Sequence, residues 1–395
     1  MPKFPVRCLI LSILALAGLG ADFVRAQGFQ TSAPSAILID AGTNTVLFEK
    51  GADDYQKPAS TVKILTAELI FQALAEGKLK LDDQFTVSEH AWRTGGAPAG
   101  GSAMFLPLNS SARVEDLLRG LVIQSGNDAA ITLAEGFAGS EEGFVTRMNK
   151  RAAELGLVKS RFGNPWGMDG PDQKVTAREM AKLAAHVIKT YPQFYGYFGE
   201  KEFTWNKIRQ QNRNPLLTMS IGADGLKTGN IDKESGYGLV GSATQDGRRL
   251  IVAIYGAKSA KERAEEARKL LQWGFRNFEE KELFKAGEPI GPAQVYGGTQ
   301  GSVQLTAKED IKVLLPRGAN ERLMGKIVYE GPVLAPVEAG AAVGRLEIKR
   351  GNAVVLEQPL QTSEAVEQGS LPRRAFDAIY ESAAAAIHQK LSGKK

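Results

Sequence analysis

Two hairpin-like segments stand far apart in the chain, with mainly helical patterns between them. Residues 36–50, AILIDAGTNTVLFEK, read as two strands around a turn at Gly42–Asn44. Tyr237–Thr244 and Arg249–Tyr255 flank Gln245–Arg248, whose Asp-Gly pair favours a tight turn between two strands. Strands at both ends with helices between them predict an α+β domain with one antiparallel sheet.

The predicted helices between the hairpins have signals at their ends. Pro58 precedes and Gly77 follows a helix expected over Ser60–Glu76. The sequence TARE, beginning at Thr176, is a capping box that predicts a helix running to about Thr190. Three further helical patterns are found at Val114–Ser125, Glu141–Leu155 and Ser259–Phe278.

The sequence changes character after Glu280. Short runs with β character alternate with glycine and proline, and no long helical period appears before Leu371. We therefore expect the α+β domain over 27–279, a small β-rich domain over 280–366 and a helix over 367–395. The β runs are Val303–Thr306, Ile311–Leu315, Ile327–Tyr329, Gly344–Lys349 and Val354–Leu356.

The first 26 residues have the pattern of an export signal. Lys3 and Arg7 are followed by the apolar run Cys8–Gly20, and Val24–Ala26 has small residues at the spacing of a cleavage site. The alternative is a membrane anchor, but the run is shorter than the roughly 20 apolar residues that a spanning helix needs. The pattern predicts a signal peptide over 1–26 and an exported mature protein.

Cysteine and histidine are scarce, which excludes several kinds of site. The single cysteine cannot form a disulfide within the chain, and cysteine-rich metal sites are excluded with it. The three histidines, His90, His186 and His388, are far apart in sequence, so we expect no metal site and no cofactor. The net charge of +5, which falls by two without residues 1–26, is too mild to indicate nucleic acid as a partner. This composition favours a nucleophilic enzyme that works without a thiolate or an imidazole, while a Ser–His–Asp triad stays open at the level of sequence.

Ser60-Thr61-Val62-Lys63 combines a hydroxyl and an amine at the start of a predicted helix. Residues three apart lie on one helix face, so the Lys63 amine can reach the Ser60 hydroxyl. A serine is a weak nucleophile until a base takes its proton, and a lysine with a lowered pKa can be that base. The pattern alone is weak, because Ser392–Lys395 also matches it and a helix cap with a surface lysine has the same sequence.

Two further motifs follow in order. Ser125-Gly126-Asn127 gives S-x-N after a helical stretch, and Lys227-Thr228-Gly229 gives K-T-G before the second hairpin. Each alone can be a turn or a strand end. Together with S-x-x-K on an exported chain, they form the signature of serine penicillin-binding proteins and their β-lactamase relatives.

The surrounding segments resemble the low-molecular-mass D-alanyl-D-alanine carboxypeptidases. The similar segments are KPASTVKILTA, SGNDAA, NRN at 212–214, DGLKTG and the Gly-rich AWRTGGAPAGGSAMFL. The resemblance covers essentially the whole mature chain. It implies a penicillin-binding domain of helices and an antiparallel sheet, a small all-β domain and a C-terminal amphipathic helix. It also implies cell-wall trimming, by removal of the terminal D-alanine from peptidoglycan pentapeptides.

The resemblance implies a division of roles in the reaction. Ser60 would attack the carbonyl between the two D-alanines, with Lys63 as its general base. Ser125 and Lys227 would complete the proton relay, and the charge of Lys227 would help to keep Lys63 neutral. The backbone N–H groups of Ser60 and Asn230 would form the oxyanion hole. Penicillins would acylate the same serine.

The remaining implied roles concern substrate binding. Asn127 would orient the substrate amide, while Thr228 and Arg213 would hold the terminal carboxylate, for which a guanidinium is well suited. Lys227, Gly229 and Asn230 complete the predicted binding set. The sequence departs from the family at Asn230, where many members have histidine, and at Pro215, where glycine is common. Asparagine in place of histidine at position 230 leaves the backbone N–H of the implied oxyanion hole unchanged.

Three alternatives remain at the level of sequence. A class A β-lactamase would need an E-x-x-L-N motif, which this chain lacks. A wall-binding scaffold without turnover is disfavoured by the intact motifs. Endopeptidase action on wall cross-links stays open within the family.

The C-terminal segment predicts a helix lying on the membrane surface. Basic residues accompany its apolar face, which suits an interfacial helix on anionic lipid, on the outer face of the cytoplasmic membrane. The alternative is a helix packed on the β-domain. The apolar positions are Phe376, Ile379, Tyr380, Ala383, Ile387 and Leu391.

Overall fold

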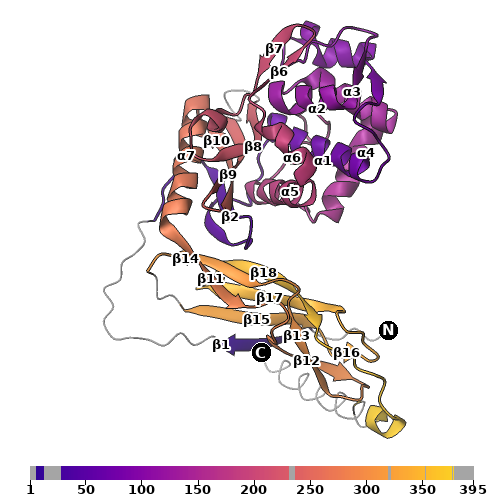
Figure 1. Cartoon of the computed structure of the whole chain (residues 1–395), viewed down its shortest axis with the longest axis vertical. Helices are drawn as coiled ribbons and strands as arrows, with labels where there is room; N and C mark the ends of the chain where they lie inside the picture. Colours follow the sequence, from indigo (N-terminus) through magenta and orange to yellow (C-terminus); the bar gives the residue numbers. More distant parts are fainter. Residues whose placement is uncertain are drawn as a thin grey trace. The chain divides into compact units, whose positions relative to one another are not determined.

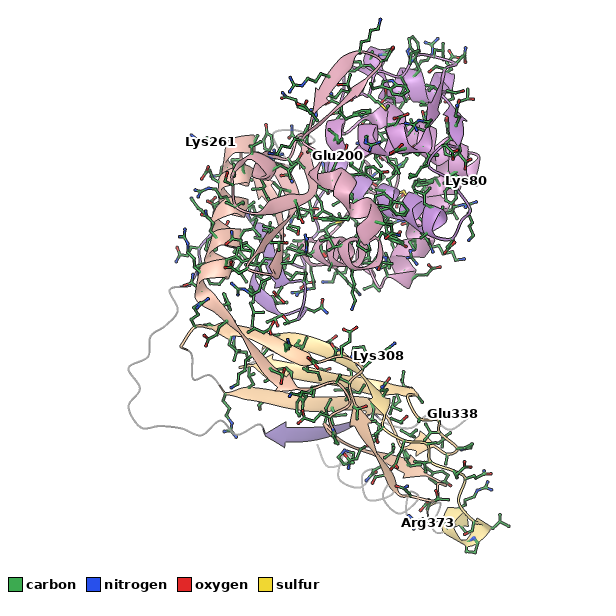
Figure 2. The ribbon with its side chains drawn as sticks, viewed as in Figure 1. Lys80, Glu200, Lys261, Lys308, Glu338 and Arg373 are labelled. Atoms are coloured by element: carbon green, nitrogen blue, oxygen red, sulfur yellow. The ribbon has the colours of Figure 1, made fainter. Side chains whose placement is uncertain are left out.

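The computed structural model describes residues 6–12, 28–230, 236–318, 322–351, 353–375 and 377. Its contacts divide the chain into two compact units (Figure 1). Of the described residues, one unit contains 28–42 and those of 46–277, and the other contains 6–12, Thr43–Thr45 and those from Phe278 onward. The interior of each unit is filled with side chains, whereas the lysines labelled in Figure 2, Lys80, Lys261 and Lys308, are exposed.

The first unit contains one five-stranded antiparallel sheet, as the two hairpins predict (Figure 1). The first hairpin supplies the two strands at one edge, the second supplies the next two, and the strand carrying K-T-G forms the opposite edge. The strands, in their order across the sheet, are β3 (Val46–Lys50), β2 (Ser35–Asp40), β10 (Arg248–Ala257), β9 (Tyr237–Gln245) and β8 (Ala223–Asn230).

Helices occupy most of the chain between the hairpins. The central one, α1 (Lys63–Ala75), is buried along nearly its whole circumference, as its predominantly apolar sequence requires. A 3₁₀ turn, η1 (Ala59–Val62), leads into it, so the predicted helix is correct but its first turn is tighter. The other long helices are α3 (Asn127–Ala138), α4 (Glu141–Glu154), α5 (Ala177–Thr190) and α7 (Ala260–Asn277).

Shorter elements complete this unit. The expected helix over Val114–Ser125 is an α-helix, α2 (Val114–Arg119), continued by one wider turn, η4 (Gly120–Gln124), that leads to the S-x-N motif. The rest are β4 (Gln84–Thr86), η2 (Ala91–Gly95), η3 (Ala97–Ala99), β5 (Ser111–Arg113), α6 (Pro192–Tyr195), η5 (Gly196–Gly199), β6 (Glu202–Trp205), β7 (Ile208–Gln211) and η6 (Pro215–Thr218).

The capping box before α5 forms only in part. The Thr176 hydroxyl accepts the N–H of Glu179 at 3.2 Å, as predicted for a helix N-terminus. The Glu179 carboxylate does not return to Thr176 but accepts the N–H of Ser160 at 2.7 Å and that of Lys159 at 2.8 Å. These two bonds satisfy a nearly buried carboxylate and tie the preceding loop to α5.

The second unit is all-β, as the sequence predicts. A seven-stranded sheet has the order β1-β15-β17-β18-β13-β12-β16, and β11 pairs with β14 in a separate ribbon. Its core contains apolar residues such as Ile327, Leu346 and Ile348. The strands are β1 (Val6–Ser12), β11 (Phe278–Phe284), β12 (Gly291–Tyr296), β13 (Ser302–Thr306), β14 (Ile311–Pro316), β15 (Leu323–Glu330), β16 (Val333–Leu334), β17 (Ala342–Arg350) and β18 (Ala353–Thr362).

The structure does not test the two predictions made for the chain ends, the signal peptide and the C-terminal helix. Residues 6–12 form β1, antiparallel to β15, and the predicted signal peptide over 1–26 stays a prediction. Residues 371–375 are helical, but most of the predicted C-terminal helix lies outside the described residues. Among the described helices, none is both long enough and apolar enough to cross a bilayer.

Candidate active site

The structure brings the hydroxyl and the amine of S-x-x-K together. Ser60 lies in the tight turn η1 and Lys63 begins α1, so the two side chains leave the same face one turn apart. The Lys63 Nζ donates a hydrogen bond to Ser60 Oγ at 3.0 Å. Lys63 is completely buried, whereas Ser60 is partly exposed. The predicted nucleophile is therefore accessible, and its predicted base is shielded from water.

Two other segments hold the Lys63 amine. Its Nζ donates to Asn127 Oδ1 at 2.8 Å and to the backbone carbonyl of Trp166 at 2.5 Å. An ammonium donates all three bonds, whereas a neutral amine has two N–H groups for Asn127 and Trp166, and its lone pair then accepts from the Ser60 hydroxyl. Lys63 thus connects the S-x-x-K and S-x-N motifs, and a third segment around Trp166 that the sequence did not mark.

The surroundings of Lys63 favour its neutral form. Burial is the largest cause that lowers its pKa well below the usual value, and the positive charges of Lys227 and Arg213 lower it further. The carboxylate of Asp128 acts in the opposite direction. A neutral amine is what a general base for the Ser60 hydroxyl requires.

The S-x-N motif forms a strained turn. Ser125 has a left-handed backbone with φ of 68°, rare for a residue with a side chain, and it ends the wide turn η4. Its hydroxyl is buried and has no hydrogen-bond partner among the described residues. The predicted relay from Lys227 through Ser125 is therefore not made as a direct hydrogen bond. Backbone strain and an unpaired buried hydroxyl are both typical of functional positions.

K-T-G lies on the edge strand β8 and packs directly on the turn that carries Ser60. A β-carbon on Gly229 would lie 2.7 Å from the Pro58 carbonyl and 3.0 Å from Ala59 Cβ, so only glycine permits this approach. Lys227 and Thr228 are buried. Burial, then the charges of Arg213 and Arg263, lower the pKa of Lys227 to about 7.

Arg213 is held by its neighbours while its side chain stays exposed. The Asn212 amide donates to the carbonyls of Phe198 and Glu200, at 3.1 and 2.9 Å. Asn214 caps η6, which begins at Pro215, where proline is well tolerated. Partial desolvation by the surrounding protein lowers the pKa of Arg213 although its surface is exposed, and its guanidinium has no carboxylate partner in the described parts of the chain. The exposed Asn230 ends β8.

Asp128, which the sequence analysis missed, fastens the Gly-rich segment to the S-x-N turn. Its Oδ1 accepts the N–H groups of Met104 at 2.7 Å and Ala129 at 2.9 Å, and its Oδ2 accepts that of Leu106 at 3.0 Å. The Asn127 N–H also donates to the Ser102 carbonyl at 2.8 Å. In the sequence Asp128 looks like an ordinary acidic residue in a first helical turn.

We expect Asp128→Asn to loosen this attachment. An amide offers one oxygen where the carboxylate offers two, so a buried backbone N–H loses its acceptor, at a cost of about 1–3 kcal/mol. Urea unfolding of the variant should show this loss of stability. Asp82→Asn, at an exposed position, is the control. Equal stability of the two variants would contradict the role given to Asp128.

A turn at residues 164–168 closes the site beside Ser60. The Asn164 Oδ1 accepts the N–H groups of Gly167 at 2.7 Å and Met168 at 3.0 Å. Gly167 has φ of 100°, and a β-carbon there would lie 2.2 Å from the Ala59 carbonyl. Residues 164–168 therefore pack on the backbone of η1, the turn that carries Ser60, and the Trp166 carbonyl is directed at Lys63.

The two described histidines lie outside this constellation. His90 Nε2 is 2.8 Å from Glu141 Oε2, and His186 Nε2 is 3.0 Å from Glu68 Oε1. Neither imidazole contacts Ser60. His388 lies outside the described residues.

Comparison with known proteins agrees with this geometry. Residues 22–259 match the family model described as D-alanyl-D-alanine carboxypeptidase, and 278–368 match that of the penicillin-binding protein 5 C-terminal domain. The chain is similar to D-alanyl-D-alanine carboxypeptidase DacC of Escherichia coli, with 42% identity over 87% of this chain and 86% of the relative.

Solved structures give the same result for the fold. The crystal structure of penicillin-binding protein 5 from Haemophilus influenzae matches with a TM-score of 0.74 and 36% identity, over 87% of this chain and 99% of that one. Penicillin-binding protein D2 from Listeria monocytogenes, in its ampicillin-bound form, matches with a TM-score of 0.56 and 28% identity, over 63% and 99%. The sequence-based assignment is confirmed: the chain belongs to the D-alanyl-D-alanine carboxypeptidase family.

Proposed function

We propose that this protein is a serine-type D-Ala-D-Ala carboxypeptidase that forms its acyl-enzyme on Ser60. The observation that carries the proposal is the contact between the Ser60 hydroxyl and a completely buried lysine amine with a lowered pKa. Family membership supports the reaction class. Peptidoglycan pentapeptides ending in D-Ala-D-Ala are the substrate, and no metal or cofactor takes part.

During acylation one proton moves from Ser60 to Lys63 and then to the leaving group. Lys63 Nζ takes the proton of Ser60 Oγ while the oxygen forms a bond to the carbonyl carbon between the two D-alanines. The backbone N–H groups of Ser60 and Asn230 stabilise the negative oxygen of the tetrahedral intermediate. The C–N bond then breaks, and the proton passes from Lys63, with Ser125 in the relay, to the amine of the leaving D-alanine.

The binding groups fit the end of the substrate. Asn127 Oδ1 accepts from Lys63, which leaves its amide N–H groups to donate to a substrate carbonyl. Arg213, without a carboxylate partner in the described residues, supplies the guanidinium for the terminal carboxylate. Thr228, Gly229 and Lys227 line the same end from β8. Water then hydrolyses the ester and frees Ser60.

Penicillins acylate Ser60 by the same route. Their lactam amide opens, so the amine stays attached to the acyl group and cannot leave the site, and hydrolysis of the ester is slow. Ampicillin bound to the Listeria relative supports this part of the proposal.

The reaction is tested by incubating the purified protein with a defined pentapeptide, with and without prior exposure to penicillin. We expect release of free D-alanine, which penicillin abolishes. Absence of D-alanine release from the untreated protein would reject the carboxypeptidase and leave a wall-binding scaffold. Release of monomers from cross-linked wall in the same assay would indicate an additional endopeptidase activity.

The proposal extends to the location of the protein. Residues 1–26 act as a cleaved signal, residues 27–279 form the catalytic domain and 280–366 the β-domain in the periplasm. In the predicted C-terminal segment, 367–395, residues 367–370 are not helical, and an amphipathic helix that begins at Leu371 lies on anionic lipid of the cytoplasmic membrane. The basic and apolar sequence of this segment supports the proposal.

Truncation after Gly369 tests the membrane contact. Because the truncated protein lacks the apolar face and its basic residues, we expect it to move from the membrane fraction to the soluble fraction. Truncation after Gly393 keeps the apolar positions and is the control. An unchanged distribution of the shorter protein would reject the anchor.

A further inference from the structure

Trp166 contacts the catalytic base with one end and a carboxylate with the other. Its backbone carbonyl accepts the hydrogen bond from Lys63 Nζ at 2.5 Å, and its indole Nε1 donates to Glu141 Oε1 at 3.1 Å. The indole is nearly buried, with 8% of the residue exposed. The position of the carbonyl is therefore coupled to the hydrogen bond at the indole.

Glu141 is itself held from the opposite side. It is the first residue of α4, and 17% of its side chain is exposed. Its second oxygen, Oε2, lies 2.8 Å from His90 Nε2, and His90 Nδ1 lies 3.2 Å from the Thr94 hydroxyl. The series of contacts thus runs from the half-exposed His90, through Glu141 and Trp166, to Lys63.

The turn that carries Trp166 is fixed on the side of the nucleophile. Thr66, on α1, donates its hydroxyl to the Pro165 carbonyl at 2.6 Å, and Gly167 lies against Ala59. These contacts restrain the backbone on both sides of Trp166. The indole bond to Glu141 restrains the residue between them, whose carbonyl reaches Lys63.

We propose that Glu141 is a positioning residue for the general base, acting through the indole of Trp166. By holding the indole, it keeps the Trp166 carbonyl in line with Lys63 and so keeps the amine within reach of the Ser60 hydroxyl. The proposal rests on the role of Lys63 as general base. Glu141 touches neither the reacting atoms nor, in this role, the substrate.

The role predicts a particular kinetic effect. A small displacement of a catalytic group lowers the rate of the chemical step steeply, so Glu141→Ala should slow acylation by about 10- to 100-fold. The KM for the pentapeptide should change little, because the groups that hold its carboxylate are untouched. The Trp166 carbonyl also favours the charged amine, so its displacement should move the acid limb of the acylation profile to lower pH.

Matched variants separate the hydrogen bond from the charge. Glu141→Gln keeps an oxygen for the indole and an N–H for His90, and should retain near-normal acylation. Trp166→Phe removes the indole N–H and should behave like Glu141→Ala, and the double variant should be no slower than either single one. Glu142→Ala removes a neighbouring exposed carboxylate from the same helix end and is the control.

Stopped-flow acylation by a chromogenic cephalosporin, pH profiles and melting temperatures are measured for the wild-type protein and the five variants. Normal acylation in Glu141→Ala overturns the proposal, as does equal loss in Glu141→Gln or in Glu142→Ala. A lower melting temperature with an unmoved acid limb also overturns it, because that result indicates a purely structural role. Failure of the wild-type protein to be acylated would instead reject the proposed function.

Discussion

Replacement of Ser60 by alanine abolishes covalent labelling by a fluorescent penicillin and lowers D-alanine release by at least about 10⁴-fold. The substitution deletes only Oγ, the atom that forms the ester in the proposed reaction. Lys63 keeps its bonds to Asn127 and Trp166, so the base and the surrounding turns stay in place. The melting temperature should therefore remain close to that of the parent protein.

The control for this variant is another serine outside the three motifs. Ser110 donates its hydroxyl to the Pro107 carbonyl at 2.7 Å, and Ser110→Ala should label normally. Labelling is read on a denaturing gel, so that only covalent adducts are counted. Persistent labelling of the Ser60 variant would show that the nucleophile has been assigned wrongly.

Much of the fold could be predicted because local patterns and tertiary structure agree. Each hairpin consists of two strand-forming runs separated by turn residues. Both hairpins are found in the sheet, with antiparallel pairing of their strands. The helix α3 was not predicted, because its sequence contains Gly136, which weakens a helix. In the fold, a β-carbon at this position would lie 2.2 Å from the Phe85 ring, so the glycine is needed for packing. A local pattern does not contain that contact.

Some groups of the candidate site could be predicted from the sequence and others could not. Ser60, Lys63, Asn127 and Lys227 could be found because their side chains form motifs, and the structure brings these motifs together. The Trp166 carbonyl could not be found, because every residue has a carbonyl and only the fold directs this one at Lys63. Asp128 was missed for a related reason, since its partners are backbone N–H groups of a distant segment.

Replacement of Lys63 by methionine is expected to slow acylation by about 10²- to 10⁴-fold, the usual contribution of a general base. Methionine has a similar length and fills the buried space, but it cannot take the Ser60 proton. The same variant tests the electrostatics of the site. The folded pKa of Lys63 lies below its unfolded value, so between these two values folding releases a proton and stability rises with pH.

The methionine variant has no amine to deprotonate on folding. Its free energy of unfolding near neutral pH should therefore equal or exceed that of the parent protein, and it should rise less with pH. Denaturant unfolding at several pH values measures this difference, and burst kinetics with a chromogenic cephalosporin measure acylation. Lys57→Met removes an exposed lysine three residues before Ser60 and serves as the control. Near-normal acylation in the Lys63 variant would exclude the amine as the base, whereas slow acylation with undiminished stability separates catalysis from folding at this residue.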